Sequence, residues 1–194
     1  MASLQQKKIL SGKDSYILGI SFGFHDSAVA LIQNGKVLNA VEEERFTGIK
    51  HDFSFPINSI NWILKQNNIS SKDISTVCYY ENPKLKHDRD WKSYWKYFWK
   101  NPFKFPKRLN HLDELEQIFP LSKIIYNNHH LSHLSYSYFT SDFKESAILS
   151  VDGVGEWDTT VLASGKNNII KRHSEVVYPH SLGLLYSTIT AFLG

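Results

Sequence analysis

Three short apolar runs separated by tight polar turns limit the choice of fold more than any other feature of the sequence. Tyr16–Phe22 and Ala28–Ile32 are predicted strands, and the polar turn Gly23–Ser27 joins them. Asn34-Gly35 is typical of a type I′ hairpin turn and leads into a third strand, Lys36–Val41. The sequence therefore predicts an antiparallel three-stranded meander, with a polar loop at its first corner.

Helices and strands alternate after the meander, which favours an α/β fold. An amphipathic helix is predicted to begin with Pro56 at its first position, a strand follows at Ile74–Tyr80, and a short acidic helix is predicted at Leu112–Phe119. A new pair of strands begins near residue 146 and is followed by a strand at Ile169–Val177 and a helix at Leu182–Leu193. We expect a flexible tail at 1–14, a first subdomain at 15–145 and the start of a second, truncated one at 146–194.

Two charged stretches allow more than one interpretation. The carboxylates Glu42–Glu44 directly after a strand are costly unless they are solvated or paired, and we expect a solvated edge. Residues 84–108 hold nine Lys or Arg and eight Trp, Tyr or Phe. This pattern is typical of an amphipathic helix with its rings inward, although it would also suit single-stranded nucleic acid or a membrane surface.

The composition excludes several classes of protein. With 42% hydrophobic and 21% charged residues, the 194-residue chain is globular rather than disordered. A formal charge of +3 is too weak to indicate a nucleic-acid partner for the whole molecule. The single cysteine, Cys78, fits a reducing compartment, and we expect a cytoplasmic protein without a signal peptide or membrane span.

A histidine-rich segment follows the short apolar run Ile124–Tyr126. Asn127 and Asn128 are turn or cap residues, and the segment behind them is predicted to be helical. In a helix, His129 and His133 lie four residues apart on one face, and His130 is rotated about 100° away from them. Histidines at i and i+4 are a common metal-binding pair, but chance pairs on a surface are equally compatible with this spacing.

The strand Ala147–Val151 leads into an acidic turn that contains two glycines. Asp152, Gly153 and Gly155 form its centre, and Thr159–Leu162 resumes the strand. Such a turn can offer N–H groups to phosphate oxygens and a carboxylate to a metal, or it can be an ordinary Asp-Gly hairpin turn.

Four separated blocks together resemble the nodulation-protein and cephamycin-type O-carbamoyltransferases. They are GISFGFHDSAVALIQNGKVLNAVEEERFTGIKHDFSFP, HHLSHLSYSYFTS, SVDGVGEWDTTV and HSLGLLYSTITAFLG, and they extend over residues 16–194. Leu134 departs from the family, which has a small residue there. The resemblance implies an actin-like ATPase fold of two similar halves, similar to the tRNA threonylcarbamoyltransferase. It also implies a carbamoyl adenylate made from carbamoyl phosphate and ATP by a separate C-terminal domain, and a sugar or natural-product hydroxyl as acceptor.

The resemblance also implies roles for individual residues. His129, His133 and Asp152 would be metal ligands, and two nitrogens with one oxygen suit Fe²⁺ or Zn²⁺ better than Ca²⁺. Gly153 and Gly155 would line the phosphates. His25 and Asp26 would face the carbamoyl group, and His130 would act on it as a base or hydrogen-bond donor. A non-catalytic truncated paralogue and a binding module that uses residues 84–108 remain alternatives.

Overall fold

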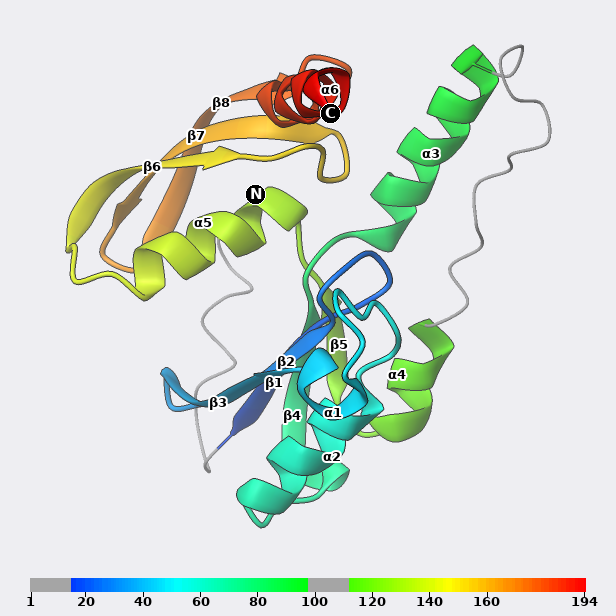
Figure 1. Ribbon diagram of the computed structural model, residues 1–194. Coiled ribbons are helices and arrows are strands. Elements are labelled where there is room, and N and C mark those ends of the chain that lie inside the picture. Colours follow the sequence, from blue (N-terminus) through cyan, green and yellow to red (C-terminus); the bar gives the residue numbers. More distant parts are fainter. Residues whose placement is uncertain (1–14, 98–111) are drawn as a thin grey trace. The chain divides into compact units, whose positions relative to one another are not determined.

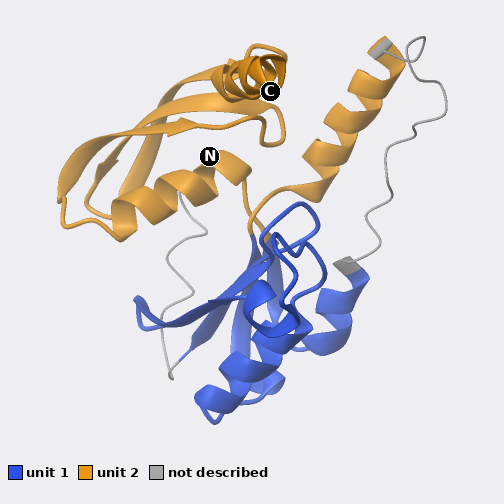
Figure 2. Ribbon diagram, in the orientation of Figure 1, with its two compact units in different colours: residues 1–79, 110–125 blue, residues 80–109, 126–194 orange. Residues whose placement is uncertain are grey.

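The computed structural model describes residues 15–97 and 112–194 (Figure 1). The chain divides into two compact units, of residues 1–79 with 110–125 and of residues 80–109 with 126–194 (Figure 2). Each unit is built on a sheet of its own.

The first unit contains a mixed sheet with the strand order β3-β2-β1-β4-β5. Its strands are β1 (Tyr16–Ser21), β2 (Ala28–Gln33), β3 (Lys36–Glu42), β4 (Ile74–Tyr79) and β5 (Lys123–Tyr126). The first three strands pair antiparallel as a meander, and β4 joins β1 in parallel. The predicted meander and its Asn-Gly turn are therefore confirmed.

Helix α2 (Ile57–Gln66) packs against β2 and β3 of this sheet. Its Ile60 and Ile63 are completely buried, as the amphipathic pattern predicts. The other helical elements of the unit are α1 (Glu44–Thr47), η2 (Ser71–Asp73) and α4 (Leu112–Ile118).

The expectation of a solvated edge at Glu42–Glu44 is wrong for its central residue. Glu43 is only 1% exposed, and its carboxylate accepts hydrogen bonds at the beginning of α2. The donors are the backbone and side chain of both Asn58 and Ser59, at 2.6–3.1 Å. The buried charge is tolerated because the exposed N–H groups of a helix N-terminus stabilise an anion.

The second unit contains an antiparallel sheet in the order β6-β7-β8. Its strands are β6 (Glu145–Val151), β7 (Asp158–Lys166) and β8 (Ile169–Val177), and its helices are α3 (Pro83–Tyr97), α5 (His129–Phe139) and α6 (Leu182–Leu193). Helix α5 lies along β6 and β7 (Figure 1). Among the described helices of the chain, none is long and apolar enough to cross a membrane.

The core of the second unit lies between α5 and the sheet. Leu134 and Tyr138 of α5 pack with Ile148, Val161 and Ala163 of β6 and β7. Alternation along the strands places these side chains on the face toward the helix, whereas Leu162 on the other face is 44% exposed. The family departure at Leu134 is therefore accommodated as a fully buried core residue.

The predicted α/β class is confirmed, and each unit has a three-stranded antiparallel meander, in agreement with the two similar halves of the actin-like fold. The predicted start of the second subdomain at residue 146 falls inside the second unit, because α5 packs on β6 and β7. Several apolar side chains of α6 are exposed; Tyr186, Phe192 and Leu193 are each at least 75% exposed.

Helix α3 carries the first half of the basic and aromatic segment. Its Tyr94 is buried, whereas Trp95 is 62% exposed. Lys92 lies 5.4 Å from the centre of the Trp157 ring, so this helix is held partly by a cation–π contact. The remainder of the segment, 98–108, lies outside the described residues.

Candidate metal centre

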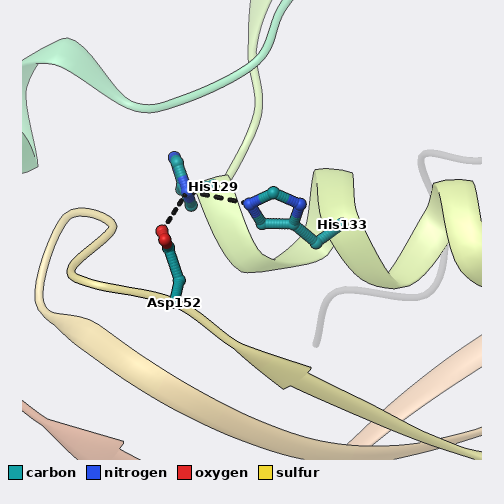
Figure 3. A group of neighbouring side chains, drawn as sticks. All are labelled: His129, His133 and Asp152. Atoms are coloured by element: carbon teal, nitrogen blue, oxygen red, sulfur yellow. Dashed lines mark hydrogen bonds and ion pairs between the residues drawn. The ribbon is translucent and has the colours of Figure 1, made fainter. Parts of the chain in front are cut away.

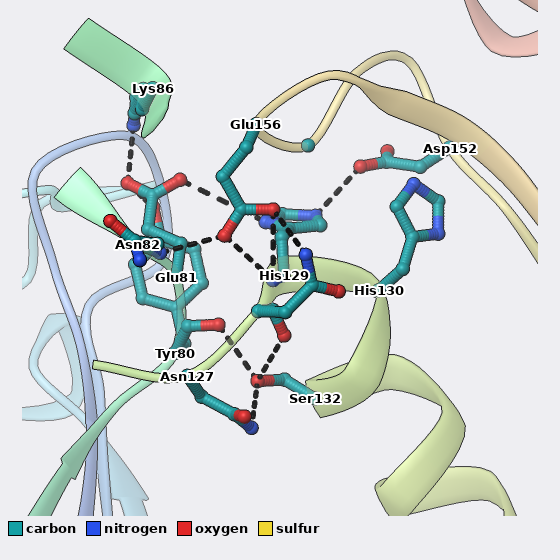
Figure 4. A network of polar contacts seen from close by, with 12 residues as sticks. Tyr80, Glu81, Asn82, Lys86, Asn127, His129, His130, Ser132, Asp152 and Glu156 are labelled. Atoms are coloured by element: carbon teal, nitrogen blue, oxygen red, sulfur yellow. Dashed lines mark hydrogen bonds and ion pairs between the residues drawn. The ribbon is translucent and has the colours of Figure 1, made fainter. Parts of the chain in front are cut away.

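Helix α5 begins at the residue that the sequence predicted, and two side chains hold its first turn. Asn128 is the N-cap, and its Oδ1 accepts a hydrogen bond from Leu131 N at 3.1 Å. The buried carboxylate of Glu156 accepts the N–H of His129 at 2.9 Å, and also the N–H of Asn82 and the side-chain amide of Asn128 (Figure 4). An anion thus sits at the positive end of the helix and fixes the position of His129.

The three predicted metal ligands lie together (Figure 3). Nε2 of His129 is 2.8 Å from Oδ2 of Asp152 and 3.0 Å from Nε2 of His133. One ligand atom from each of the three residues lies within 4.8 Å of the others. The two histidines come from successive turns of α5, and Asp152 comes from the end of β6.

The loop that carries Asp152 is shaped by several close contacts. A Cβ atom at Gly155 would lie 3.0 Å from the His129 side chain, so a glycine lets the loop approach the helix. Arg89 of α3 donates a hydrogen bond to the carbonyl oxygen of Gly155. A Cβ atom at Gly183 would lie 2.5 Å from the carbonyl oxygen of Asp152, which shows how tightly the start of α6 packs there.

The predicted phosphate-binding role of Gly153 and Gly155 stays a prediction. In this structure the Gly153 N–H donates to Oδ1 of Asp152 at 2.6 Å, and the Gly155 N–H donates to the carbonyl of Asp158 at 2.9 Å. Both N–H groups therefore stabilise the loop itself.

The pKa values of Asp152 and His133 are shifted by contacts with neighbouring residues of the cluster and by partial burial. The hydrogen bond from His129, together with that from Gly153, holds the pKa of Asp152 well below its usual range, although partial burial opposes this shift. The pKa of His133 is lowered, first by partial desolvation of its ring and then by the neighbouring His129. An ionised carboxylate beside an imidazole that favours its neutral form, as in the pair of Asp152 and His133, is the protonation state that metal binding requires.

His130 lies beside this cluster, with its ring centroid 5.7 Å from that of His129 and 6.2 Å from that of His133, but its hydrogen bonds are made inside the protein. It is fully buried; its Nδ1 lies 2.8 Å from Ser150 Oγ and its Nε2 lies 2.9 Å from the carbonyl oxygen of Asp158. Because a carbonyl oxygen only accepts, Nε2 carries the hydrogen and Nδ1 accepts from the serine. Burial lowers the pKa of His130, and both ring nitrogens join α5 to the sheet. Its predicted catalytic role stays a prediction.

The donor set fits a first-row metal ion. Ligand atoms of such an ion at ~2.0–2.2 Å lie roughly 3–4 Å from one another. Nε2 of His129 lies 2.8 Å from Oδ2 of Asp152 and 3.0 Å from Nε2 of His133, so these side chains need to move apart only slightly to admit such an ion. In addition, Nδ1 of His129 is buried without a hydrogen-bond partner among the described residues, so the ring is not satisfied by protein contacts alone.

His25 and Asp26 lie in the first unit, at the corner between β1 and β2. Asp26 bridges two histidines, with Oδ2 2.8 Å from His25 Nδ1 and Oδ1 2.9 Å from His51 Nδ1. Hydrogen bonds from His51 and then His25 lower the pKa of Asp26. Asp26 and His51 both have positive φ angles, of 47° and 58°, so the backbone is held in an uncommon conformation at this pair.

Comparison with known proteins assigns the family. The profile described as Carbamoyltransferase N-terminus matches residues 16–104 and 92–194 of the chain. The chain belongs to this family. The resemblance read from the four sequence blocks is therefore confirmed.

Relatives of this carbamoyltransferase N-terminus extend well beyond it. An uncharacterized protein of Synechocystis sp. is 40% identical over 198 residues, which cover 93% of this chain and 32% of that protein. Nodulation protein NolNO of Sinorhizobium fredii is 33% identical and covers 88% of this chain and 25% of its own length. The chain thus spans about a quarter to a third of the length of these relatives.

Solved structures of similar shape are more distant. YeaZ from Pseudomonas aeruginosa has a TM-score of 0.44 at 11% identity, and the match covers 85% of this chain and 67% of that one. A member of the Ppx/GppA family from Aquifex aeolicus has a TM-score of 0.40 at 10% identity and covers 92% of this chain and 55% of that one.

Three residues of this family member escaped the sequence reasoning as parts of a site. No helical or strand spacing in the sequence pairs His51 with another candidate residue. Its only signal was its place after Lys50 in the first of the four blocks. Glu81 and Glu156 are 3% and 1% exposed, and both lie beside His129. An acidic residue directly after a strand or within a glycine turn is ordinarily solvated, so the pattern gave no signal for these two carboxylates.

Proposed function

We propose that the chain is the N-terminal part of an O-carbamoyltransferase. In this reaction the hydroxyl oxygen of a sugar or natural product forms a bond to the carbamoyl carbon of a carbamoyl adenylate. The bond from that carbon to the phosphate oxygen breaks, AMP leaves, and a base takes the hydroxyl proton. The observation that carries the proposal is the convergence of His129, His133 and Asp152 in a member of the carbamoyltransferase N-terminus family.

These three side chains would hold a divalent metal, with Fe²⁺ or Zn²⁺ favoured by the two imidazoles and one carboxylate. When bound, the ion would neutralise charge on the phosphate leaving group and polarise a substrate oxygen. The chain keeps the ligands oriented through the Glu156 carboxylate at the start of α5 and the Gly153 N–H on Asp152. The loop glycines, Gly153 and Gly155, would lie along the phosphates in this proposal.

His25 is the residue best arranged to act as the base. Its Nδ1 contacts Asp26, which orients the ring and stabilises the imidazolium that forms after proton transfer. The ring is 61% exposed, so Nε2 can receive a proton from a substrate. His130, which is buried with both nitrogens engaged, supports the reaction in this proposal by holding α5 against the sheet.

Metal binding is the first test of this proposal. The purified chain should bind one equivalent of Zn²⁺ or Co²⁺, and His133→Ala should lose the metal while its circular dichroism stays unchanged, because His133 lies at an exposed position of a helix. His173 of β8, in an exposed contact with Ser164 of β7, provides the matched control: His173→Ala should keep the metal.

Donor binding is the second test. A stable analogue of carbamoyl adenylate should change the visible spectrum of the Co²⁺-loaded chain, and it should not do so with His133→Ala. A chain that retains Co²⁺ and does not bind the analogue would contradict the carbamoyl-transfer assignment and favour the non-catalytic alternative. Turnover with a panel of hydroxyl acceptors would show that these 194 residues suffice, whereas we expect a separate adenylate-forming domain to be required.

A further inference from the structure

A buried carboxylate lies behind the first histidine of the metal cluster, on the side away from Asp152. Glu81 is the second residue after the end of β4 and is only 3% exposed. Its Oε1 accepts hydrogen bonds from Lys86 Nζ at 2.5 Å and from Tyr80 Oη at 2.9 Å. Its Oε2 lies 3.9 Å from Nδ1 of His129 (Figure 4). One oxygen is thus anchored, and the other faces the imidazole.

The two ring nitrogens of His129 differ in their contacts: Nε2 has a hydrogen-bond partner, whereas Nδ1 has none among the described residues. Nε2 faces the carboxylate of Asp152 at 2.8 Å, and because a carboxylate only accepts, Nε2 carries the hydrogen there. Nδ1 is buried and has no hydrogen-bond partner among the described residues. In a neutral ring Nδ1 is then a bare lone pair directed toward Glu81, which cannot donate a hydrogen to it.

Metal binding would reverse this arrangement. A metal ion takes the lone pair of Nε2, so the single hydrogen of the neutral ring must sit on Nδ1, to which it moves by exchange with solvent. The ring keeps one hydrogen, and no proton is lost overall. Glu81 Oε2 is then an acceptor facing a donor, and a shift of about 1 Å brings the pair of atoms within hydrogen-bond range.

We propose that Glu81 is a positioning residue of the metal centre: it accepts the Nδ1 hydrogen of His129 and so selects the tautomer that presents Nε2 to the metal. The inference rests on the metal site of the proposed function and adds a residue to it. Three observations support it: the nearly complete burial of Glu81, the anchoring of its other oxygen by Lys86 and Tyr80, and the unsatisfied Nδ1. Outer carboxylates of this kind raise the basicity of a histidine ligand and fix its orientation.

The test compares dissociation constants for Zn²⁺ at one fixed pH, measured by competition with a chromophoric chelator. Glu81→Gln keeps an acceptor oxygen but loses the charge, and we expect roughly 10-fold weaker binding; Glu81→Ala, which removes the acceptor, should approach ~100-fold. Glu145→Gln is the matched control, because it makes the same substitution at a carboxylate that is 64% exposed in its pair with Lys166. Its dissociation constant should stay within about twofold of wild type.

The outcomes separate this inference from the proposed function. If the wild-type chain binds no Zn²⁺, the metal centre itself is wrong. If wild type binds and His133→Ala does not, but Glu81→Gln binds as tightly as wild type, the positioning role is overturned. It is equally overturned if Glu145→Gln loses as much affinity as Glu81→Gln, because the loss would then follow from removing a carboxylate anywhere on the chain and not from the contact with His129.

A measurement on the wild-type chain covers the case in which the Glu81 variants do not fold. In the ¹⁵N-labelled, Zn²⁺-loaded protein, Nδ1 of His129 should carry a hydrogen that exchanges slowly with water and resonates far downfield, as expected for a bond to a carboxylate. A His129 Nδ1 hydrogen that exchanges at the rate of a solvent-exposed imidazole would refute the contact with Glu81.

Discussion

Replacing Glu156 with glutamine should substantially destabilise the second unit. The Glu156 carboxylate is 1% exposed and accepts from Asn82 N at 2.7 Å, Asn128 Nδ2 at 2.9 Å and His129 N at 2.9 Å. Every one of these partners is a donor. Glutamine exchanges one acceptor oxygen for an NH₂ group, so in either orientation of its amide at least one donor faces another donor.

The magnitude follows from the bonds that are lost. A hydrogen bond to a charged group contributes about 1.5–3 kcal/mol, and a buried donor left without an acceptor costs about 1–3 kcal/mol. Losing one such bond and weakening the others predicts a decrease of roughly 2–4 kcal/mol in the free energy of unfolding. For a chain of this size, that corresponds to a melting temperature lower by roughly 5–15 °C.

Urea denaturation followed by circular dichroism measures this change. Glu145→Gln is the matched control, since that carboxylate is 64% exposed in its pair with Lys166 and should change stability by less than ~1 kcal/mol. The opposing effect is relief of the cost of burying a charge. If that effect dominated, Glu156→Gln would equal or exceed wild type in stability, and the reasoning about the α5 N-terminus would be refuted.

Three further predictions concern packing, pH and the metal. Gly165→Ala should lower the free energy of unfolding by about 1–3 kcal/mol, because the new Cβ would lie 2.5 Å from the Tyr138 ring, whereas Gly19→Ala meets only an ordinary contact at 3.8 Å and should cost less. The pKa of His130 is lowered in the folded chain, so below its usual pKa near 6.5 the unfolded chain binds a proton that the folded chain does not. The free energy of unfolding should therefore fall as pH falls, by up to ~1.4 kcal/mol per pH unit from this residue. In urea denaturation, the difference in stability between wild type and His130→Gln should shrink between pH 7 and 5, and a constant difference would contradict this. Adding Zn²⁺ at about 100 times its dissociation constant should stabilise wild type by ~2.7 kcal/mol and leave His133→Ala unchanged in thermal unfolding.

Local patterns determined most of the elements. Tyr16–Phe22 and Ala28–Ile32 were recognisable because strands need only a short apolar run between turn residues, and the Asn34-Gly35 turn fixed the antiparallel pairing of the second strand with the third. The helical period likewise places His129 and His133 on one face of α5, where their ring centroids lie 4.7 Å apart. These features depend on residues within a few positions of one another, so the sequence expresses them directly.

The sequence also indicated Asp152 as a partner of the two histidines, but only through the family resemblance. No local pattern brings a residue 23 positions away to within 2.8 Å of His129. That contact depends on α5 packing through Leu134 against β6, and on a glycine at position 155 that lets the loop approach the helix.

Tertiary structure alone decided the roles of the buried charges. Glu43, Glu81 and Glu156 resemble ordinary surface carboxylates in the sequence, yet each is at most 3% exposed. A carboxylate can be buried only where other segments supply its donors, and the donors to Glu156 include the N–H of Asn82, 74 residues away. His130 was directed into the core for the same reason, because Ser150 and Asp158 of the sheet satisfy both of its nitrogens. Propensity and spacing describe what a residue can form with its neighbours, whereas the partners that make burial of a charge tolerable come from the folded chain.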